Sequence, residues 1–133
     1  MSVKAVIDTN VIVSSLISKS PFSPPTKIAD AILDNRFKLV YSQGMLDEYE
    51  EVLGRDCLKL PKDKVCAMLA HIKAAGEVVE PMPSDNDFPD PDDKVFFCTA
   101  LAADASLVTG NIKHYPKSAI VVTPAEFCKI LGI

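Results

Sequence analysis

The sequence has few of the residues that common metal and cofactor sites require. Its 133 residues include only two histidines, and its four cysteines form no C-x-x-C pair. Zinc sites need such ligands at short spacing, so zinc binding is not expected. With five glycines and no G-x-x-x-x-G-K-[ST] segment, the chain also lacks a phosphate-binding loop. We expect the cysteines to be small buried residues in a reducing compartment.

The chain also lacks an excess of positive charge and any long apolar segment. Its net charge of −4 and pI of about 5.1 give no general reason to expect binding to polyanions, so nucleic-acid binding would need a local basic patch or a bound metal. No signal-peptide pattern opens the chain and no apolar run could span a bilayer, which predicts a soluble cytoplasmic protein. The length and the hydrophobic content of 48% predict a single domain over residues 1–133.

Apolar periodicity predicts strands that alternate with helices. Short apolar runs predict strands at 3–8, 37–42, 77–81, 106–110 and 119–123. Helical spacing predicts helices at 10–18, 26–37, 43–55, 61–76, 93–105 and 124–132, with loops at 18–25 and 82–92. This alternation predicts an α/β fold, a three-layer α/β/α sandwich with a mainly parallel central sheet. In such sheets ligands bind beyond the carboxyl ends of the strands.

Four oxygen-bearing side chains are predicted to meet at this edge of the sheet. Asp8 ends the first strand, and Asn111 follows the fourth strand after a glycine. Glu48 borders the apolar face of the helix at 43–55, and Asp93 begins a helix in line with its apolar stripe. Carboxylates gathered in this way repel each other unless a cation neutralises them. Oxygen ligands without cysteine or histidine favour Mg²⁺ or Mn²⁺ over Zn²⁺.

Each acid also has a plain structural interpretation. Asp8 and Asp90 could cap helices, with Pro91 in a first helical turn and Asp92 in water. Glu48 alone would suit the edge of a solvated helix face. The convergence of the acids, and no single one of them, therefore favours a cation site.

The order of these motifs resembles that of PIN domains and is similar to that of VapC-type toxin ribonucleases. The similarity rests on VIDTNVIVS (6–14), YSQGMLDEYEEVL (41–53), DPDDKVFFCTALAADASLVTGN (90–111) and VVTPAEF (121–127). The resemblance implies an endoribonuclease that hydrolyses RNA phosphodiester bonds with Mg²⁺ or Mn²⁺. Asp8, Glu48 and Asp93 would be its catalytic metal ligands. Asn111 stands where the family often has aspartate, and it could bind a metal through a neutral carbonyl or hold a metal-bound water.

Further residues are assigned around this predicted centre. The hydroxyls of Thr9, Ser42 and Thr109 are candidates to orient the carboxylates, although each could serve a turn or a cap instead. Lys113, His114 and Lys117 are candidates for a basic rim that binds RNA phosphates, or for a solvated loop. The resemblance also implies an antitoxin partner and a homodimer, and the lack of a long apolar run predicts no membrane association.

Two other functions compete with the nuclease interpretation. A Mg²⁺-dependent phosphotransferase or phosphatase acting on a small molecule would also carry an aspartate after the first strand. Haloacid-dehalogenase-like enzymes need D-x-D there, whereas this chain has Asp8-Thr9-Asn10. An interaction module that keeps a PIN-like fold with weak or no activity would be consistent with Asn111. Residues 85–96 do not form an EF-hand loop, because its glycine and terminal glutamate are absent.

Overall fold

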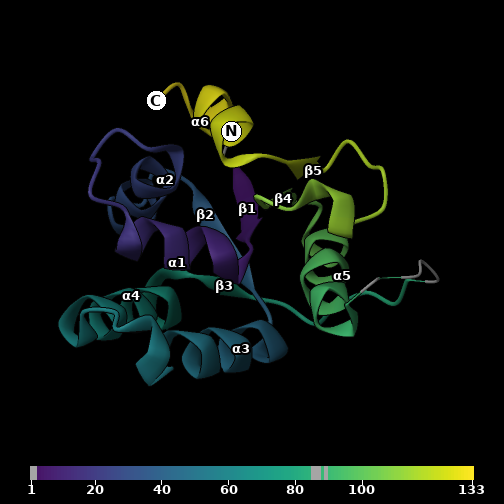
Figure 1. Ribbon diagram of the computed structural model, residues 1–133. Helices are drawn as coiled ribbons and strands as arrows, with labels where there is room; N and C mark the ends of the chain where they lie inside the picture. The colour runs from purple at the N-terminus through teal and green to yellow at the C-terminus, as the bar shows by residue number, and fades with distance from the viewer. Residues whose placement is uncertain (1–2, 85–87, 89) are drawn as a thin grey trace.

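The centre of the protein is a five-stranded sheet in the order β3-β2-β1-β4-β5 (Figure 1). The computed structural model describes residues 3–84, 88 and 90–133. All four strand pairings are parallel. The strands are β1 (Lys4–Ile7), β2 (Lys38–Tyr41), β3 (Glu77–Val78), β4 (Ser106–Val108) and β5 (Val121–Val122). This confirms the predicted α/β class with a parallel sheet.

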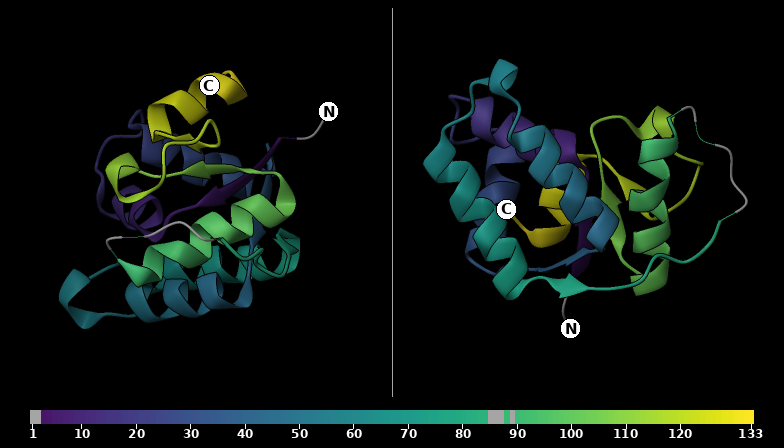
Figure 2. Two further views of the ribbon diagram at one scale, coloured as in Figure 1. Left: turned by 90° about the vertical axis from the view of Figure 1, so that its right-hand side faces the viewer. Right: turned by 90° about the horizontal axis from the view of Figure 1, so that it is seen from below.

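Helices cover both faces of the sheet. In the described residues these are α1 (Thr9–Ile17), α2 (Pro24–Leu33), α3 (Gln43–Leu53), α4 (Lys62–Ala75), α5 (Lys94–Ala103) and α6 (Pro124–Leu131). Short 3₁₀ helices are η1 (Asp56–Leu58), η2 (Pro91–Asp93) and η3 (Ile112–His114). Figure 2 shows α5 on one face of the sheet and α1, α2, α4 and α6 on the other, where α2 contacts α1 and α6 and lines shared hollows with α4. The predicted three-layer arrangement is therefore confirmed.

The strands lie at the centre of the hydrophobic core, because helices enclose them on both faces. Val6, Ile7, Val40 and Leu107 have no exposed surface. Near-continuous apolar runs suit strands that are buried on both sides. The buried strands therefore set the positions of the residues that follow their carboxyl ends, where the site residues lie.

The start of α2 corrects one prediction. The sequence analysis placed a loop up to residue 25 and began the helix at residue 26, whereas Ser23 is the N-cap and its side chain accepts a hydrogen bond from the Thr26 backbone N–H at 3.4 Å. Pro24 and Pro25 occupy the first helical positions, where a backbone N–H has no intrahelical partner to lose.

Other predictions were confirmed in part. Cys98 and Cys128 are buried as expected, but Cys57 and Cys66 are exposed, because they lie in η1 and on the solvent face of α4. The predicted loop at 82–92 includes residues 85–87 and 89, which lie outside the described residues, and it ends in η2. Within the described part of the chain, no helix has the length and apolar character needed to cross a membrane.

Candidate active site

Asp8 lies at the carboxyl end of β1, where the chain turns into α1. It occupies the N-cap position of α1, yet its side chain makes no capping hydrogen bond. Its Oδ2 atom instead accepts hydrogen bonds from Thr109 Oγ1 at 2.7 Å and from Tyr115 Oη at 3.3 Å. The side chain is almost fully buried, with 4% of the residue exposed. Asp8 is therefore held toward β4 and the segment that follows it, and it does not act as a helix cap.

Glu48 lies on α3, which follows the neighbouring strand β2. Its carboxylate is half-buried, and Glu48 Oε2 accepts a hydrogen bond from Thr9 Oγ1 at 2.6 Å. Burial raises the pKa of Glu48, and the charges of Asp8, Asp92 and Asp93 raise it further against the opposing effect of the Thr9 hydrogen bond. The electrostatic influence of these acids on Glu48 means that the predicted carboxylates share one region of the molecule.

Asp93 stands between η2 and α5 and is half-buried. It holds the N-cap position of α5 without a capping hydrogen bond, whereas Asp90 does cap η2 by accepting from the Asp92 backbone N–H at 3.0 Å. Asp93 Oδ2 is buried and has no hydrogen-bond partner among the described residues. His114 Nδ1 lies 3.4 Å away, at the distance of an ion pair.

The charge environment of Asp93 resembles that of Glu48. Burial raises the pKa of Asp93, the charges of Asp8 and Asp90 raise it further, and His114 lowers it. A buried carboxylate oxygen without a hydrogen bond, next to other acids, is a position where positive charge is favourable.

Two predicted site residues form no hydrogen bond with the acids in the described part of the chain. Asn111 is exposed at the N-cap of η3, and its side chain neither caps that helix nor bonds to another described residue. Its backbone N–H donates to Thr109 Oγ1 at 3.0 Å. Ser42 Oγ accepts a hydrogen bond from Thr99 Oγ1 at 2.8 Å, so Ser42 joins the start of α3 to α5, and it forms no hydrogen bond with a carboxylate of the described residues. The assignment of Asn111 as a metal ligand stays a prediction.

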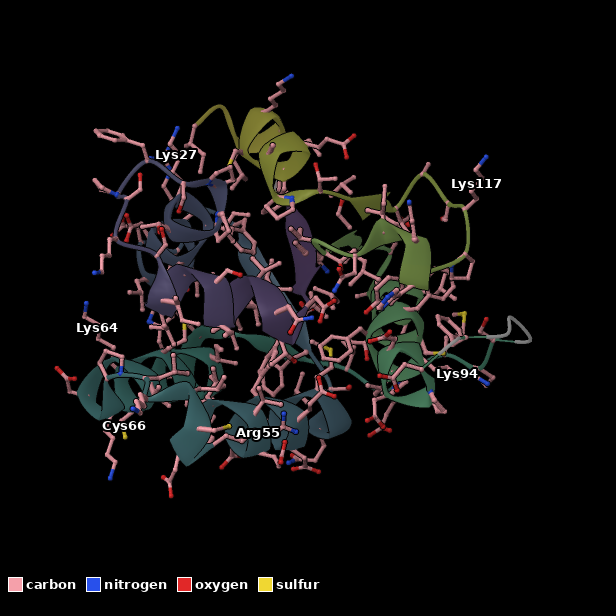
Figure 3. The ribbon with its side chains drawn as sticks, in the orientation of Figure 1. Lys27, Arg55, Lys64, Cys66, Lys94 and Lys117 are labelled. Carbon is pink, nitrogen blue, oxygen red and sulfur yellow. The ribbon has the colours of Figure 1, made fainter. Side chains whose placement is uncertain are left out.

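The predicted basic rim lies on the segment between β4 and β5. Lys113, His114 and Lys117 are all exposed. Figure 3 shows Lys117 extending outward from this segment. The contact between His114 and Asp93 places the segment directly beside the acids. The sequence analysis did not predict that contact.

Two buried tyrosines complete the site and were also missed by the sequence analysis. Tyr115 donates to Asp8, and Tyr49 donates its hydroxyl to the Ile7 carbonyl, which ties α3 to the end of β1. Burial, followed by the charge of Asp8, raises the pKa of both tyrosines, so both remain protonated donors. An aromatic residue in the polar stretch after His114 was the signal that could have identified Tyr115.

The donors fit a hard divalent cation in their chemistry. As the side chains stand, no three histidine, cysteine, aspartate or glutamate residues of the described ranges are gathered closely enough to hold a metal together. The buried Asp93 Oδ2 and the mutual repulsion of the acids nevertheless favour a cation at this edge. Asp8 and Asp93 would hold Mg²⁺ or Mn²⁺ through carboxylate oxygens, with Glu48 beside them.

The parallel sheet with acids at its carboxyl edge matches a known class of protein. A family model described as PIN domain matches residues 4–113, and the chain therefore belongs to the PIN domain family, whose members are generally nucleases. The chain is also 30% identical over 118 residues to the uncharacterized protein MJ1680 of Methanocaldococcus jannaschii, an alignment that covers 84% of this chain and 72% of that relative.

Proposed function

We propose that this protein is a metal-dependent endoribonuclease that hydrolyses RNA phosphodiester bonds. The observation that carries the proposal is the buried Asp93 Oδ2, which has no hydrogen-bond partner among the described residues, lies near acids that repel it, and has only the exposed His114 at 3.4 Å to offset that repulsion. A carboxylate is kept in this state where a cation completes its environment. Membership of the PIN domain family supports phosphodiester hydrolysis as the reaction.

The three acids have separate roles in this proposal. Asp8 and Asp93 hold the cation, and Thr109 and Tyr115 fix one oxygen of Asp8 so that the other remains available. Mg²⁺ or Mn²⁺, when bound, supplies positive charge that polarises the phosphate and lowers the pKa of a water. Glu48, whose pKa is raised by burial, orients that water and accepts its proton. Thr9 holds Glu48 in place through its hydrogen bond.

The basic rim explains how a chain with a net charge of −4 could bind RNA. Lys113, His114 and Lys117 lie beside the acids and would contact phosphates that flank the cleaved bond. The cation would neutralise the acids themselves. The RNA backbone would then contact positive charge at the cation and at the basic rim.

The test is cleavage of a structured RNA by the purified protein in Mg²⁺ or Mn²⁺. Wild type is compared with Asp93→Asn, with Asp92→Asn as the matched control on an exposed neighbouring acid, and with wild type in EDTA. Wild type and Asp92→Asn should cleave, whereas Asp93→Asn and the EDTA sample should not. Cleavage that persists in Asp93→Asn or in EDTA would disprove the mechanism. No cleavage together with no metal-dependent rise in melting temperature would favour an inactive interaction module.

A more specific proposal is that this ribonuclease is the toxin of a toxin–antitoxin pair. It rests on the similarity of the motifs to VapC-type ribonucleases, which also implies an antitoxin and a homodimer. Expression of the wild-type chain should arrest bacterial growth, and expression of Asp93→Asn should not. Light scattering of the purified protein measures whether it is a dimer.

A further inference from the structure

A hollow beside Asp8 is not used by the proposed chemistry. It has a volume of about 330 Å³ and opens where β1 and β4 end. Its polar lining comes from Asn10, Ser14 and Asn111, and its apolar lining comes from Val11, Val13, Pro25 and Pro124. We propose that this hollow binds a nucleobase of the RNA next to the cleaved phosphate, an inference that rests on the proposed ribonuclease function.

The position of the hollow follows from the two strands that carry the site. Asn10 comes two residues after Asp8, and Asn111 comes two residues after Thr109, whose hydroxyl donates to Asp8. Pro25 and Pro124 belong to α2 and α6, on the face of the sheet opposite to α5 (Figure 2). A strand of RNA that crosses this edge would place a phosphate over the acids and an adjoining base in the hollow.

The chemistry of the lining suits a base better than a phosphate or a metal. No charged side chain of the described residues lines the hollow. The side-chain amides of Asn10 and Asn111 are exposed and form no hydrogen bond with any residue that the structure describes. Each amide offers donors and an acceptor together, which is the pattern found on the edge of a base. The volume lies within the usual range for small-ligand sites.

This inference gives Asn111 a second interpretation besides that of metal ligand. An amide contributes only a neutral carbonyl to a cation, but it contributes both a donor and an acceptor to a base. Asn111→Asp separates the two roles. If Asn111 is a ligand, the carboxylate should strengthen metal binding and keep the preference for bases. If Asn111 contacts a base, the variant should lose that preference, because its donor is gone.

The experiment measures base preference around the cleavage site. A random-sequence oligoribonucleotide pool is cleaved in Mn²⁺, and the products are sequenced for wild type, Asn10→Ala, Asn111→Ala and Asn111→Asp. Asn35→Gly is the matched control, since it removes an amide near the start of β2, and its backbone φ of 55° suits glycine. We expect one position beside the cut to lose discrimination on the order of tenfold in the three site variants but not in the control. Unchanged preference in all of them would overturn the proposal.

A binding measurement keeps this inference separate from the proposed function. In Asp93→Asn, the side-chain amide signals of Asn10 and Asn111 are followed by ¹⁵N NMR while A₅, C₅ or U₅ oligoribonucleotides are added. Shifts of both signals, larger for one base than for the others and not shared by Asn35, support the hollow even if wild type fails to cleave RNA. Cleavage by wild type with unmoved Asn10 and Asn111 signals would leave the ribonuclease proposal standing and overturn this one.

Discussion

Thr109 Oγ1 lies 2.7 Å from Asp8 Oδ2, although 101 residues separate the two along the chain. The hydrogen bond joins the ends of β1 and β4, which are adjacent parallel strands. It uses one oxygen of Asp8 and holds the carboxylate away from the helix that it would otherwise cap. The site is therefore built on a contact between strand ends, and its strength can be measured.

Replacing Thr109 by valine should destabilise the protein. The change keeps the shape of the side chain but removes the donor to the buried Asp8 carboxylate, which should lower the free energy of unfolding by about 1–3 kcal/mol. Urea unfolding at pH 7 without metal measures the loss. Thr109→Ser, which keeps the hydroxyl, is the control and should lose less. An equal loss in both variants would mean that packing of the methyl group, and not the hydrogen bond, stabilises this contact.

Asp93→Asn should stabilise the metal-free protein while abolishing cleavage. The pKa of Asp93 is raised by burial, and then by Asp8 and Asp90, so its ionised form costs stability at pH 7. Neutralising it should raise the melting temperature by roughly 2–5 °C, a shift that corresponds to about 1 kcal/mol for a domain of this size. Asp92→Asn is the control on an exposed neighbour and should change the melting temperature less. A lower melting temperature in Asp93→Asn would contradict the charge repulsion that we infer.

Removing Glu48 and Asp93 together should change how stability depends on pH. Both carboxyls have pKa values raised above the unfolded values near 4, so the folded state binds their protons more tightly. The stability that this provides is fully present below the unfolded pKa and is lost as pH rises through the raised pKa values. Scanning calorimetry of metal-free wild type from pH 4 to pH 7.5 should show that decline. A Glu48→Gln/Asp93→Asn double variant should show less of it, and parallel curves would argue against the raised pKa values.

Mg²⁺ or Mn²⁺ should stabilise wild type and should not stabilise Asp8→Asn. A ligand that binds only the folded state at a hundred times its Kd adds roughly 2.7 kcal/mol to the free energy of unfolding. The gain should weaken as pH falls, because protonation of Glu48 and Asp93 competes with the cation. Thermal melts across metal concentrations give the affinity. A gain of equal size in Asp8→Asn would place the cation somewhere else.

Alanine at Lys113 or Lys117 should weaken RNA binding without changing which sequences are cleaved. Each lost phosphate contact should reduce the slope of log K against log salt concentration by about 0.7 for single-stranded RNA. Filter binding of Asp93→Asn at several salt concentrations measures the slope. Lys64→Ala is the control, since Figure 3 shows Lys64 and Lys117 on opposite sides of the molecule. An equal reduction of the slope in Lys64→Ala would mean that the basic rim makes no specific phosphate contacts.

Much of the fold could be predicted because apolar periodicity reports local burial. The runs around β1, β2 and β4 are nearly continuous in the sequence, and their residues are buried between two layers of helices. The start of α2 was missed because Pro24 and Pro25 were taken as helix breakers, although the first helical turn tolerates proline. The exposure of Cys57 and Cys66 was missed because residue type alone does not reveal which face of a helix meets a neighbour.

The sequence by itself determined which acids end strands or begin helices, and so it identified Asp8, Glu48 and Asp93 as candidates. Only the tertiary structure decided that Asp8 and Asp93 leave their helices uncapped, because one oxygen of each faces a residue from another part of the chain, Thr109 for Asp8 and His114 for Asp93. It also decided that Tyr115 and His114 contact those acids, whereas among the described residues Asn111 and Ser42 form no hydrogen bond with them. The physical reason is that strand order and loop path set which side chains meet, and neither is encoded in local periodicity.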